Sequence, residues 1–515
     1  MNVGSYLTRA AVSYPDNIAQ VFGDKKYTYK EMNQRVNSLA AALRNMGLQK
    51  GDRIGIYQKN SHCFMETLFA CFKLGCCAIP MNFRLHPKEV VYHLNDARAA
   101  AVFFSKDFNE DLKDITKELP HTEHYISQAD PAEGQLDYEK LISDNWTEEE
   151  QMVDVDKDDL AWLFYTSGTT GRPKGAMLTH ANLVATSVGW SADLMHLHPE
   201  DIALQAAPLS HGGGIHAIAV VAKAGTNIVQ EYFRAKDVLE AIDNFKVTNF
   251  WGVPTMIKML ADYPEVSDYD LSSLKWVVYG GAPMYVEDLK KAIEKIGPVF
   301  VQIFGQGETP MTGTYLRPQE HVIDGSEEEV RRLLSAGIER TCTEVKIFDE
   351  EDKEASPGVK GEIVVRGPAV MTGYWERPEE TEKTLRGGWL HTGDVGYKDK
   401  YGYIYLVDRS KDVIISGGAN VYPRELEEVL AQHPRIHEVA VIGMPDEYWG
   451  EIVVAVVVTK PGLDLGEDDV VQFCADNLAG YKKPKRVEFL NKLPKSAYGK
   501  ILKRELRDMF TNDKK

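Results

Sequence analysis

The sequence predicts an α/β protein with a large N-terminal domain of stacked, mostly parallel α/β sheets and a small α+β domain at the C-terminal end. Short apolar runs of strand length, such as Arg53–Tyr57 and Cys77–Pro80, alternate with helical patterns such as Phe64–Leu74. This alternation is typical of parallel sheets whose faces are covered by helices. A chain of 515 residues also exceeds what one hydrophobic core usually fills, so at least two domains are expected.

Capping and turn residues bound several of the expected elements. Thr28–Glu31 is a capping box, and the apolar residues after it recur at helical spacing, which predicts a packed helix. Strands that end in glycine turns are expected at Phe250–Pro254, Lys275–Pro283 and Pro298–Phe304. The acidic, poorly periodic stretch Gln128–Asp158 is interpreted as a surface connection.

Two changes of pattern divide the chain. Over roughly residues 340–408, short alternating runs are broken by Gly, Pro and Asp, which predicts a small β-barrel-like subdomain. A new, more charged α+β pattern then begins, with strands expected at Glu438–Ile442 and Ile452–Val458. We therefore expect an N-terminal domain over residues 1–408 and a C-terminal domain over residues 411–515.

Composition excludes several classes of protein. With 43% hydrophobic and 26% charged residues, the chain belongs with soluble globular proteins. Its net charge of -18 disfavours a nucleic-acid partner, because the phosphate backbone would be repelled. No apolar run approaches the roughly 20 residues that cross a bilayer, and the first residues lack the apolar core of a secretory signal. The sequence leaves a monomer and a homodimer both open.

The cysteines have neither the spacing of a metal site nor that of a redox pair. We interpret them as small buried hydrophobic residues in a reducing cytoplasm. They are Cys63, Cys71, Cys76, Cys77, Cys342 and Cys474.

One glycine- and hydroxyl-rich stretch, Tyr165–His180, is the strongest functional signal in the chain. The apolar run before it predicts a buried strand, and a helix is expected to start at Thr179. Glycines let backbone N–H groups turn toward one point, and hydroxyls and Lys174 add donors, so the loop is interpreted as a cradle for a polyphosphate. An ordinary polar surface loop is the alternative. The spacing differs from a P-loop, since Gly175 follows the lysine.

Two further loops carry candidate side chains. Glu308 follows a predicted buried strand within a glycine-rich turn, where a carboxylate suits Mg²⁺ on ATP, although such a residue is usually only solvated. His211 precedes Gly212, Gly213 and Gly214, which suggest a roomy ligand pocket; a histidine beside a tight turn is the alternative.

The stretch Ser167–Gly175 resembles the signature of the adenylate-forming superfamily, which includes acyl-CoA synthetases, luciferases and the adenylation domains of peptide synthetases. Later motifs extend the resemblance over nearly the whole chain, and the acyl-CoA synthetase branch, which includes fatty-acid–CoA ligases, is the most similar. The resemblance implies ATP, Mg²⁺ and CoA as ligands, and a mobile C-terminal lid.

The resemblance also assigns roles to individual positions. Glu308 would bind the metal, Lys500 would balance charge in adenylate formation, and Lys411 would be the hinge between domains. His211, Gly212 and Gly213 would border the acyl pocket, and Gly417 and Gly418 the CoA arm. The remaining nucleotide contacts would be Thr166, Ser167, Gly168, Thr169, Thr170, Gly171, Lys174, Gly281, Ala282, Pro283, Gln302, Gly305, Thr309, Asp394 and Arg409.

One position departs from the family pattern. Gly307 stands where the family has a threonine that contacts the α-phosphate and the substrate carboxylate. Either Thr309 or Gln306 replaces that hydroxyl, or the contact is lost.

The reaction that this resemblance implies is the AMP-forming ligation of a carboxylic acid to CoA through an acyl-adenylate. The three glycines after His211 suit a medium- or long-chain fatty acid or an aromatic acid better than acetate. We favour a fatty acid, with an aromatic acid as the alternative. A stand-alone amino-acid adenylation domain, a luciferase and a non-catalytic nucleotide-binding homologue are the competing interpretations.

Overall fold

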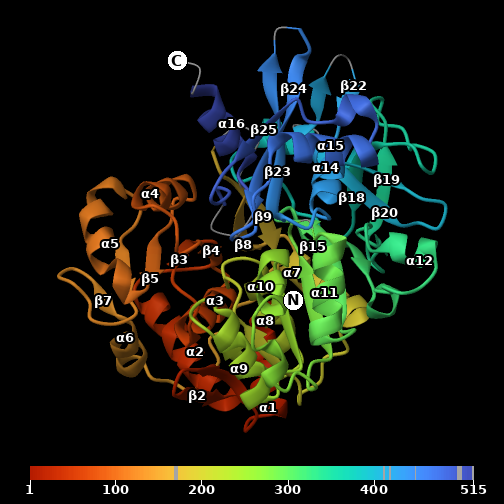
Figure 1. The fold of residues 1–515 in the computed structure, drawn as a ribbon. Helices are drawn as coiled ribbons and strands as arrows, with labels where there is room; N and C mark the ends of the chain where they lie inside the picture. Colours follow the sequence, from red (N-terminus) through yellow and green to blue (C-terminus); the bar gives the residue numbers. More distant parts are fainter. Residues whose placement is uncertain are drawn as a thin grey trace.

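The computed structural model describes residues 1–166, 172–282, 284–409, 412–416, 419–446, 448–495 and 501–512. Two large sheets lie side by side in the N-terminal part, and the C-terminal elements, drawn in blue, lie above them (Figure 1). The expected α/β class with a small C-terminal α+β unit is confirmed.

The first large sheet has the strand order β7-β6-β5-β3-β4-β8-β9. All neighbouring pairs are parallel except β8 and β9, which form a hairpin. Its strands are β3 (Arg53–Tyr57), β4 (Cys77–Pro80), β5 (Ala101–Phe104), β6 (His124–Ser127), β7 (Leu136–Asp137), β8 (Leu160–Thr166) and β9 (Lys174–Thr179). Its helices are α2 (Tyr29–Asn45), α3 (His62–Leu74), α4 (Pro87–Asp96), α5 (Asn109–Ile115) and α6 (Tyr138–Asp144).

The second large sheet has the order β16-β15-β14-β13-β12-β10-β11-β1-β2 and is parallel from β14 to β1. Its strands are β1 (Ile18–Phe22), β2 (Lys25–Thr28), β10 (Ile202–Gln205), β11 (Thr226–Val229), β12 (Asn249–Gly252), β13 (Trp276–Gly280), β14 (Phe300–Gln306), β15 (Thr309–Leu316) and β16 (Ile338–Glu339). The helices of this part, together with the N-terminal one, are α1 (Ser5–Ser13), α7 (His180–Gly189), α8 (Gly212–Val221), α9 (Ala235–Phe245), α10 (Pro254–Ala261), α11 (Val286–Ile296) and α12 (Glu327–Arg332).

Two smaller sheets complete the structure. The β subdomain is a four-stranded antiparallel sheet, and the C-terminal sheet has the order β22-β21-β24-β23 with β25 paired to β24. The strands are β17 (Glu344–Phe348), β18 (Gly361–Arg366), β19 (Leu390–Lys398), β20 (Ile404–Arg409), β21 (Ile414–Ser416), β22 (Ala419–Val421), β23 (Ile436–Asp446), β24 (Gly450–Thr459) and β25 (Arg486–Phe489). The helices are α13 (Pro378–Thr384), α14 (Pro423–Leu430), α15 (Glu467–Asn477) and α16 (Lys503–Asn512).

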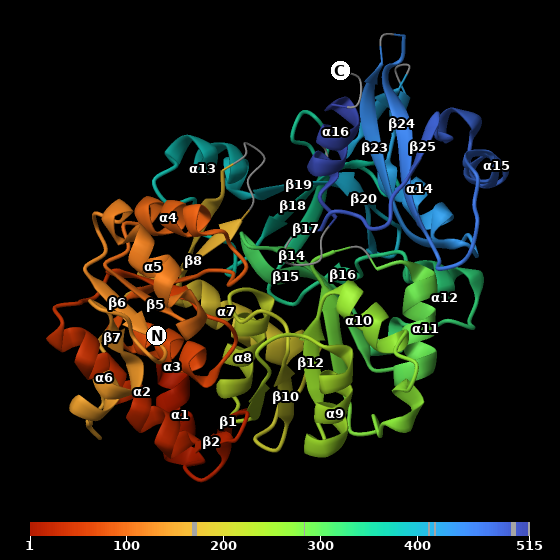
Figure 2. The ribbon, with the colours of Figure 1, turned by 60° about the vertical axis from the view of Figure 1, so that its left-hand side comes forward.

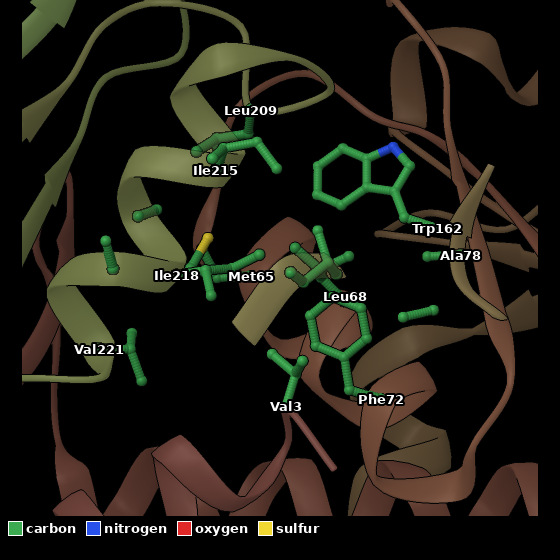
Figure 3. Close-up of a cluster of buried hydrophobic side chains, with 14 of the residues drawn as sticks. Val3, Met65, Leu68, Phe72, Ala78, Trp162, Leu209, Ile215, Ile218 and Val221 are labelled. Carbon is green, nitrogen blue, oxygen red and sulfur yellow. The ribbon is translucent and has the colours of Figure 1, made fainter. Parts of the chain in front are cut away.

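Helices α3 and α8 lie between the two large sheets (Figure 2). Every residue of both helices is buried, and their apolar side chains meet in one core with Trp162 of β8 (Figure 3). Burial on all sides fits the mainly apolar sequences of the two helices, although α3 also buries His62, Glu66 and Lys73. This shared core holds the two large sheets together.

Capping residues in the sequence correctly predicted where two helices begin. The Thr28–Glu31 capping box forms, with the Thr28 side chain accepting from the Glu31 backbone N–H, and α2 follows it. Thr179 caps α7 in the same way. Both helices therefore begin where the sequence predicted.

Two expectations need correction. The stretch Gln128–Asp158 is not only a surface connection, because it contains α6, whose buried Tyr138 donates a hydrogen bond to the buried Glu66 at 2.9 Å. Cys342 is exposed, whereas the other cysteines are buried as expected. Among the described helices, none is both long and apolar enough to cross a membrane.

Candidate active site

Strands β8 and β9 lie on either side of the predicted phosphate cradle in the sequence and pair with each other. The sequence predicted a loop up to the helix at Thr179, but residues Lys174–Thr179 form β9, which pairs with β8 so that Thr166 lies opposite Lys174. The hairpin is held at its base, because the Tyr92 hydroxyl donates to Pro173 O at 2.8 Å and the Trp375 backbone N–H donates to Gly175 O at 2.8 Å. The described residues on both sides of the cradle are therefore held in a strand pair.

Glu308 lies beside this hairpin and is nearly buried, with 8% of its surface exposed. Its Oε1 accepts hydrogen bonds from the Thr166 hydroxyl at 3.0 Å and from the Tyr374 hydroxyl at 2.7 Å. Lys174 Nζ lies 4.4 Å from the centre of the Tyr374 ring. The structure thus brings together three residues that the sequence singled out and adds a tyrosine between them.

Tyr374 was missed by sequence reasoning. It stands in an unremarkable Gly-Tyr-Trp run, 66 residues from Glu308, and no spacing rule relates the two positions. Burial, followed by the negative charge of Glu308, raises the pKa of the Tyr374 hydroxyl. It therefore stays protonated and donates its hydrogen bond to the carboxylate.

The glycine at position 307 is required by packing. A Cβ at Gly307 would lie 2.4 Å from Thr166 Cγ2 and 2.6 Å from Phe164 Cδ1. The space that a threonine would need is therefore filled by side chains of β8. Gly307 departs from the family pattern, and the packing of Thr166 and Phe164 around it fits a glycine at this position.

Of the two residues that could replace the missing threonine, Gln306 faces the site and Thr309 does not. Gln306 Nε2 donates to Asp394 Oδ2 at 2.7 Å and to Thr392 O at 2.9 Å. Thr309 is fully buried, and its hydroxyl is hydrogen-bonded to the Thr312 hydroxyl at 2.7 Å. Of these two residues, Gln306 is the one that joins the large sheet to the strand that carries Asp394.

Asp394 lies within β19 and not in a turn, opposite Arg409 at the end of β20. Only 5% of Asp394 is exposed, and its backbone N–H donates to the Thr392 hydroxyl at 3.1 Å. Strand pairing therefore presents this carboxylate beside Gln306 with little freedom to move.

The expected adenine turn lies at the carboxyl ends of β13 and β14, where ligands bind in open parallel sheets. Gly281 has a φ of +80°, and a Cβ there would meet open space. Gln302 lies opposite Tyr279 on the neighbouring strand, and within the described part of the chain its buried Oε1 has no hydrogen-bond partner. Gly305 occupies the irregularity of β14 between Phe304 and Gln306. Ala282 is half-buried beside the turn.

The residues expected at the acyl pocket begin helix α8. His211 packs its ring edge-on against Phe164, with ring centres 5.0 Å apart. Burial, with a smaller contribution from the charge of His93, lowers the pKa of His211 to about 3, so it is neutral.

The glycines after His211 do not leave open space on their Cβ sides. A Cβ at Gly212 would lie 2.0 Å from Met311 Cε and 2.9 Å from the Trp251 ring, and one at Gly213 would lie 2.7 Å from Ala207 O. The roomy pocket inferred from these glycines is therefore corrected: they allow close packing of α8 against its neighbours.

The other expected site residues lie outside the described part of the chain. They are Ser167, Gly168, Thr169, Thr170, Gly171, Pro283, Lys411, Gly417, Gly418, Lys500 and the side chain of Arg409.

Comparisons with known proteins show the family to which the chain belongs. The family described as AMP-binding enzyme matches residues 7–375, and the AMP-binding enzyme C-terminal domain matches residues 425–500. A feruloyl-CoA synthase from an Amycolatopsis species is 39% identical over 514 residues, covering 99% of each chain. A long-chain-fatty-acid–CoA ligase from Bacillus subtilis is 35% identical over 542 residues, covering 99% of this chain and 94% of the relative. The crystal structure of the anthranilate CoA ligase AuaEII with anthranoyl-AMP has a TM-score of 0.92 at 28% identity, covering 100% of this chain and 98% of that one.

The two family models together cover most of the chain, and this match defines the class as adenylate-forming enzymes. The chain belongs to the AMP-binding enzyme family, within the acyl-CoA synthetase branch of the adenylate-forming superfamily, and is an AMP-forming acid–thiol ligase.

Proposed function

We propose that the protein joins a carboxylic acid to CoA at the expense of ATP, through an acyl-adenylate and with release of AMP and pyrophosphate. The observation that carries the proposal is the convergence of Thr166, Lys174 and Glu308 at the base of the cradle, beside the Gln306–Asp394 pair. This arrangement suits a triphosphate at one end and a ribose at the other.

Different residues of the chain would bind different parts of the substrates. The 166–174 hairpin would hold the β- and γ-phosphates, and Asp394 would accept hydrogen bonds from the ribose hydroxyls. Lys500 would offset the charge that builds between the α-phosphate and the attacking carboxylate. Residues 411–515 would then rotate about Lys411 as a lid and present Gly417 and Gly418 to CoA.

Glu308 fits a bound Mg²⁺. Its carboxylate is a hard oxygen ligand of the kind that this ion prefers, and the hydroxyls of Thr166 and Tyr374 orient it. When bound there, the ion would neutralise charge on the phosphates of ATP.

We propose an aromatic acid as the substrate, with a medium- or long-chain fatty acid as the alternative. The open space inferred at Gly212 and Gly213 suited both classes of acid, and on the Cβ sides of these glycines it is packed. Aromatic rings lie around the start of α8: Trp251 contacts the Gly212 position, and Phe164 packs on His211. The 39% identity to a feruloyl-CoA synthase supports the same choice.

The test is a panel of acids assayed for ATP–pyrophosphate exchange without CoA and for AMP release with CoA. Benzoate, ferulate, octanoate and palmitate cover the two classes, and a set of amino acids tests the adenylation-domain alternative. Exchange with an aromatic acid, and AMP release only when CoA is added, is the expected result. Nucleotide binding without exchange for any acid would instead identify a non-catalytic homologue.

A further inference from the structure

Met311 adopts an unusual backbone conformation at the start of β15. Its φ is +58°, in the left-handed region that L residues with large side chains rarely adopt. The conformation directs Met311 Cε to within 2.0 Å of where a Cβ at Gly212 would stand, against the same face that the Trp251 ring touches. The methionine therefore closes the space over the residues expected to border the acid.

A neighbouring segment holds the backbone on which Met311 stands. Three successive carbonyls of β15 are bound by residues 340–343: Met311 O accepts from Arg340 Nη1, Thr312 O accepts from the Thr343 hydroxyl at 2.8 Å, and Gly313 O accepts from the Arg340 backbone N–H at 3.3 Å. Three consecutive acceptors leave this part of the strand little freedom to relax.

Arg340 is itself fixed from a third element. It is 2% exposed, and its Nε donates to Asp193 Oδ2 at 3.2 Å. Asp193, in the helical turn Trp190–Leu194, also accepts from the Thr341 hydroxyl. Gly189 makes room for the guanidinium, because a Cβ there would lie 2.9 Å from Arg340 Nη2. The planar guanidinium binds the carboxylate and the carbonyl through donors in a fixed fork, a geometry that the flexible point charge of a lysine does not reproduce.

We infer that Arg340 is a positioning residue for acid selection: paired with Asp193, it holds Met311 in the left-handed conformation, so that the methionine side chain limits the length of the acid that enters beside Gly212. The inference rests on the proposed function, because it takes the start of α8 as the border of the acid pocket. It concerns which acid is accepted, and it leaves the nucleotide site unchanged.

The test compares kcat/KM for the acid that the wild-type enzyme prefers with kcat/KM for a homologue two carbons longer. Met311→Ala should raise the ratio of the longer to the shorter acid by about tenfold or more, since one methylene in a pocket is worth roughly 10- to 200-fold. Arg340→Lys, which retains a cation for Asp193, should shift the ratio in the same direction by about threefold or more. The KM for ATP should stay within about twofold in both variants, because the Met311 side chain points at Gly212 and the Arg340 side chain is bound to Asp193 and Met311 O.

A double variant and a control make the result decisive. Arg340→Lys combined with Met311→Ala should shift the ratio no further than Met311→Ala alone, since both changes act through one side chain. Arg317→Lys is the control, because Arg317 pairs with Glu320 at 2.8 Å outside this cluster, and the ratio should not change. If Arg340→Lys does not fold, Met311→Ala and Gly212→Ala carry the test: the first should favour the longer acid and the second the shorter.

The inference is overturned if the acid ratio stays at the wild-type value in Met311→Ala or in a folded Arg340→Lys variant. It is also overturned if the ATP KM changes as much as the acid ratio. Failure of the proposed function is a separate result, since the wild-type enzyme would then show no acid-dependent exchange at all.

Discussion

The Tyr374 hydroxyl donates a 2.7 Å hydrogen bond to Glu308 Oε1, the same oxygen that accepts from the Thr166 hydroxyl at 3.0 Å. Two elements far apart in the chain thus orient one carboxylate beside the cradle. Each bond is made to a charged acceptor, which makes it stronger than a bond between neutral groups.

We expect Glu308→Gln to lower the rate of ATP–pyrophosphate exchange by about 10²-fold or more, because the variant loses the charge that would hold the metal at the phosphates. Tyr374→Phe should lower it by only about tenfold, the effect of about 1.4 kcal/mol in the barrier. Exchange assays at saturating acid measure both. Equal losses in the two variants would contradict the orienting role given to Tyr374.

A second prediction concerns the packing at position 307. Gly307→Ala should lower both thermal stability and exchange activity, because overpacking a filled site typically costs about 1–3 kcal/mol. Thr166→Ser removes the Cγ2 that lies 2.4 Å from the new Cβ and keeps the hydroxyl for Glu308. The double variant should therefore recover part of the lost stability and activity.

Differential scanning calorimetry and exchange assays check this prediction. Gly480→Ala is the matched control, since a Cβ at Gly480 meets nothing within 4 Å. A Gly307→Ala enzyme with wild-type stability would show that the site is not filled.

A third prediction is that stability falls as the pH is lowered from about 6.5 to 4, in part because of buried histidines. Burial lowers the pKa of His216 to about 4 from 6.5. The ring stacks on Trp190, with Nδ1 3.2 Å from Gln205 Nε2 and Nε2 2.8 Å from Asn249 Oδ1. Because the unfolded state binds the proton first, each such group contributes a slope of about 1.4 kcal/mol per pH unit within that window.

Urea unfolding between pH 7.5 and 4.5 measures the slope. His216→Gln should reduce the dependence of the free energy of unfolding on pH, even though it also lowers stability at neutral pH. His196→Gln, at an exposed position, should leave the slope unchanged. An unaltered slope in the His216 variant would show that this group does not titrate differently in the two states.

Much of the fold was predictable because its signals are local. The capping residues Thr28 and Thr179 and the apolar strands β3 and β4 are specified by residues within a few positions of one another. Strands β9 and β15 were not predicted, because their sequences lie in glycine-rich motifs without alternation. Each becomes a strand by pairing in a hairpin, with β8 and β14 respectively, and such pairing is a tertiary effect that outweighs local preference.

The site was predictable in its residue types but not in its contacts. Glu308, Gln306 and Asp394 stand in recognisable motifs, whereas the contact of Gln306 with Asp394 and the partner Tyr374 of Glu308 are found only in the folded structure. The three glycines after His211 also show what residue types alone do not predict. Glycine signals that something lies close to the backbone, and here that neighbour is protein and not ligand.

The last prediction separates the two half-reactions. Lys500→Ala should abolish adenylate formation while leaving transfer from supplied acyl-AMP to CoA largely intact, because the ammonium is needed only while charge builds between carboxylate and α-phosphate. Lys411→Pro should do the reverse, since it would stiffen the proposed hinge and spare pyrophosphate release. Lys492→Ala, at an exposed position in the same C-terminal part, is the charge-matched control and should affect neither step. Single-turnover assays with acid and ATP, and separately with acyl-AMP and CoA, measure each half, and an equal loss of both in Lys500→Ala would contradict this division of labour.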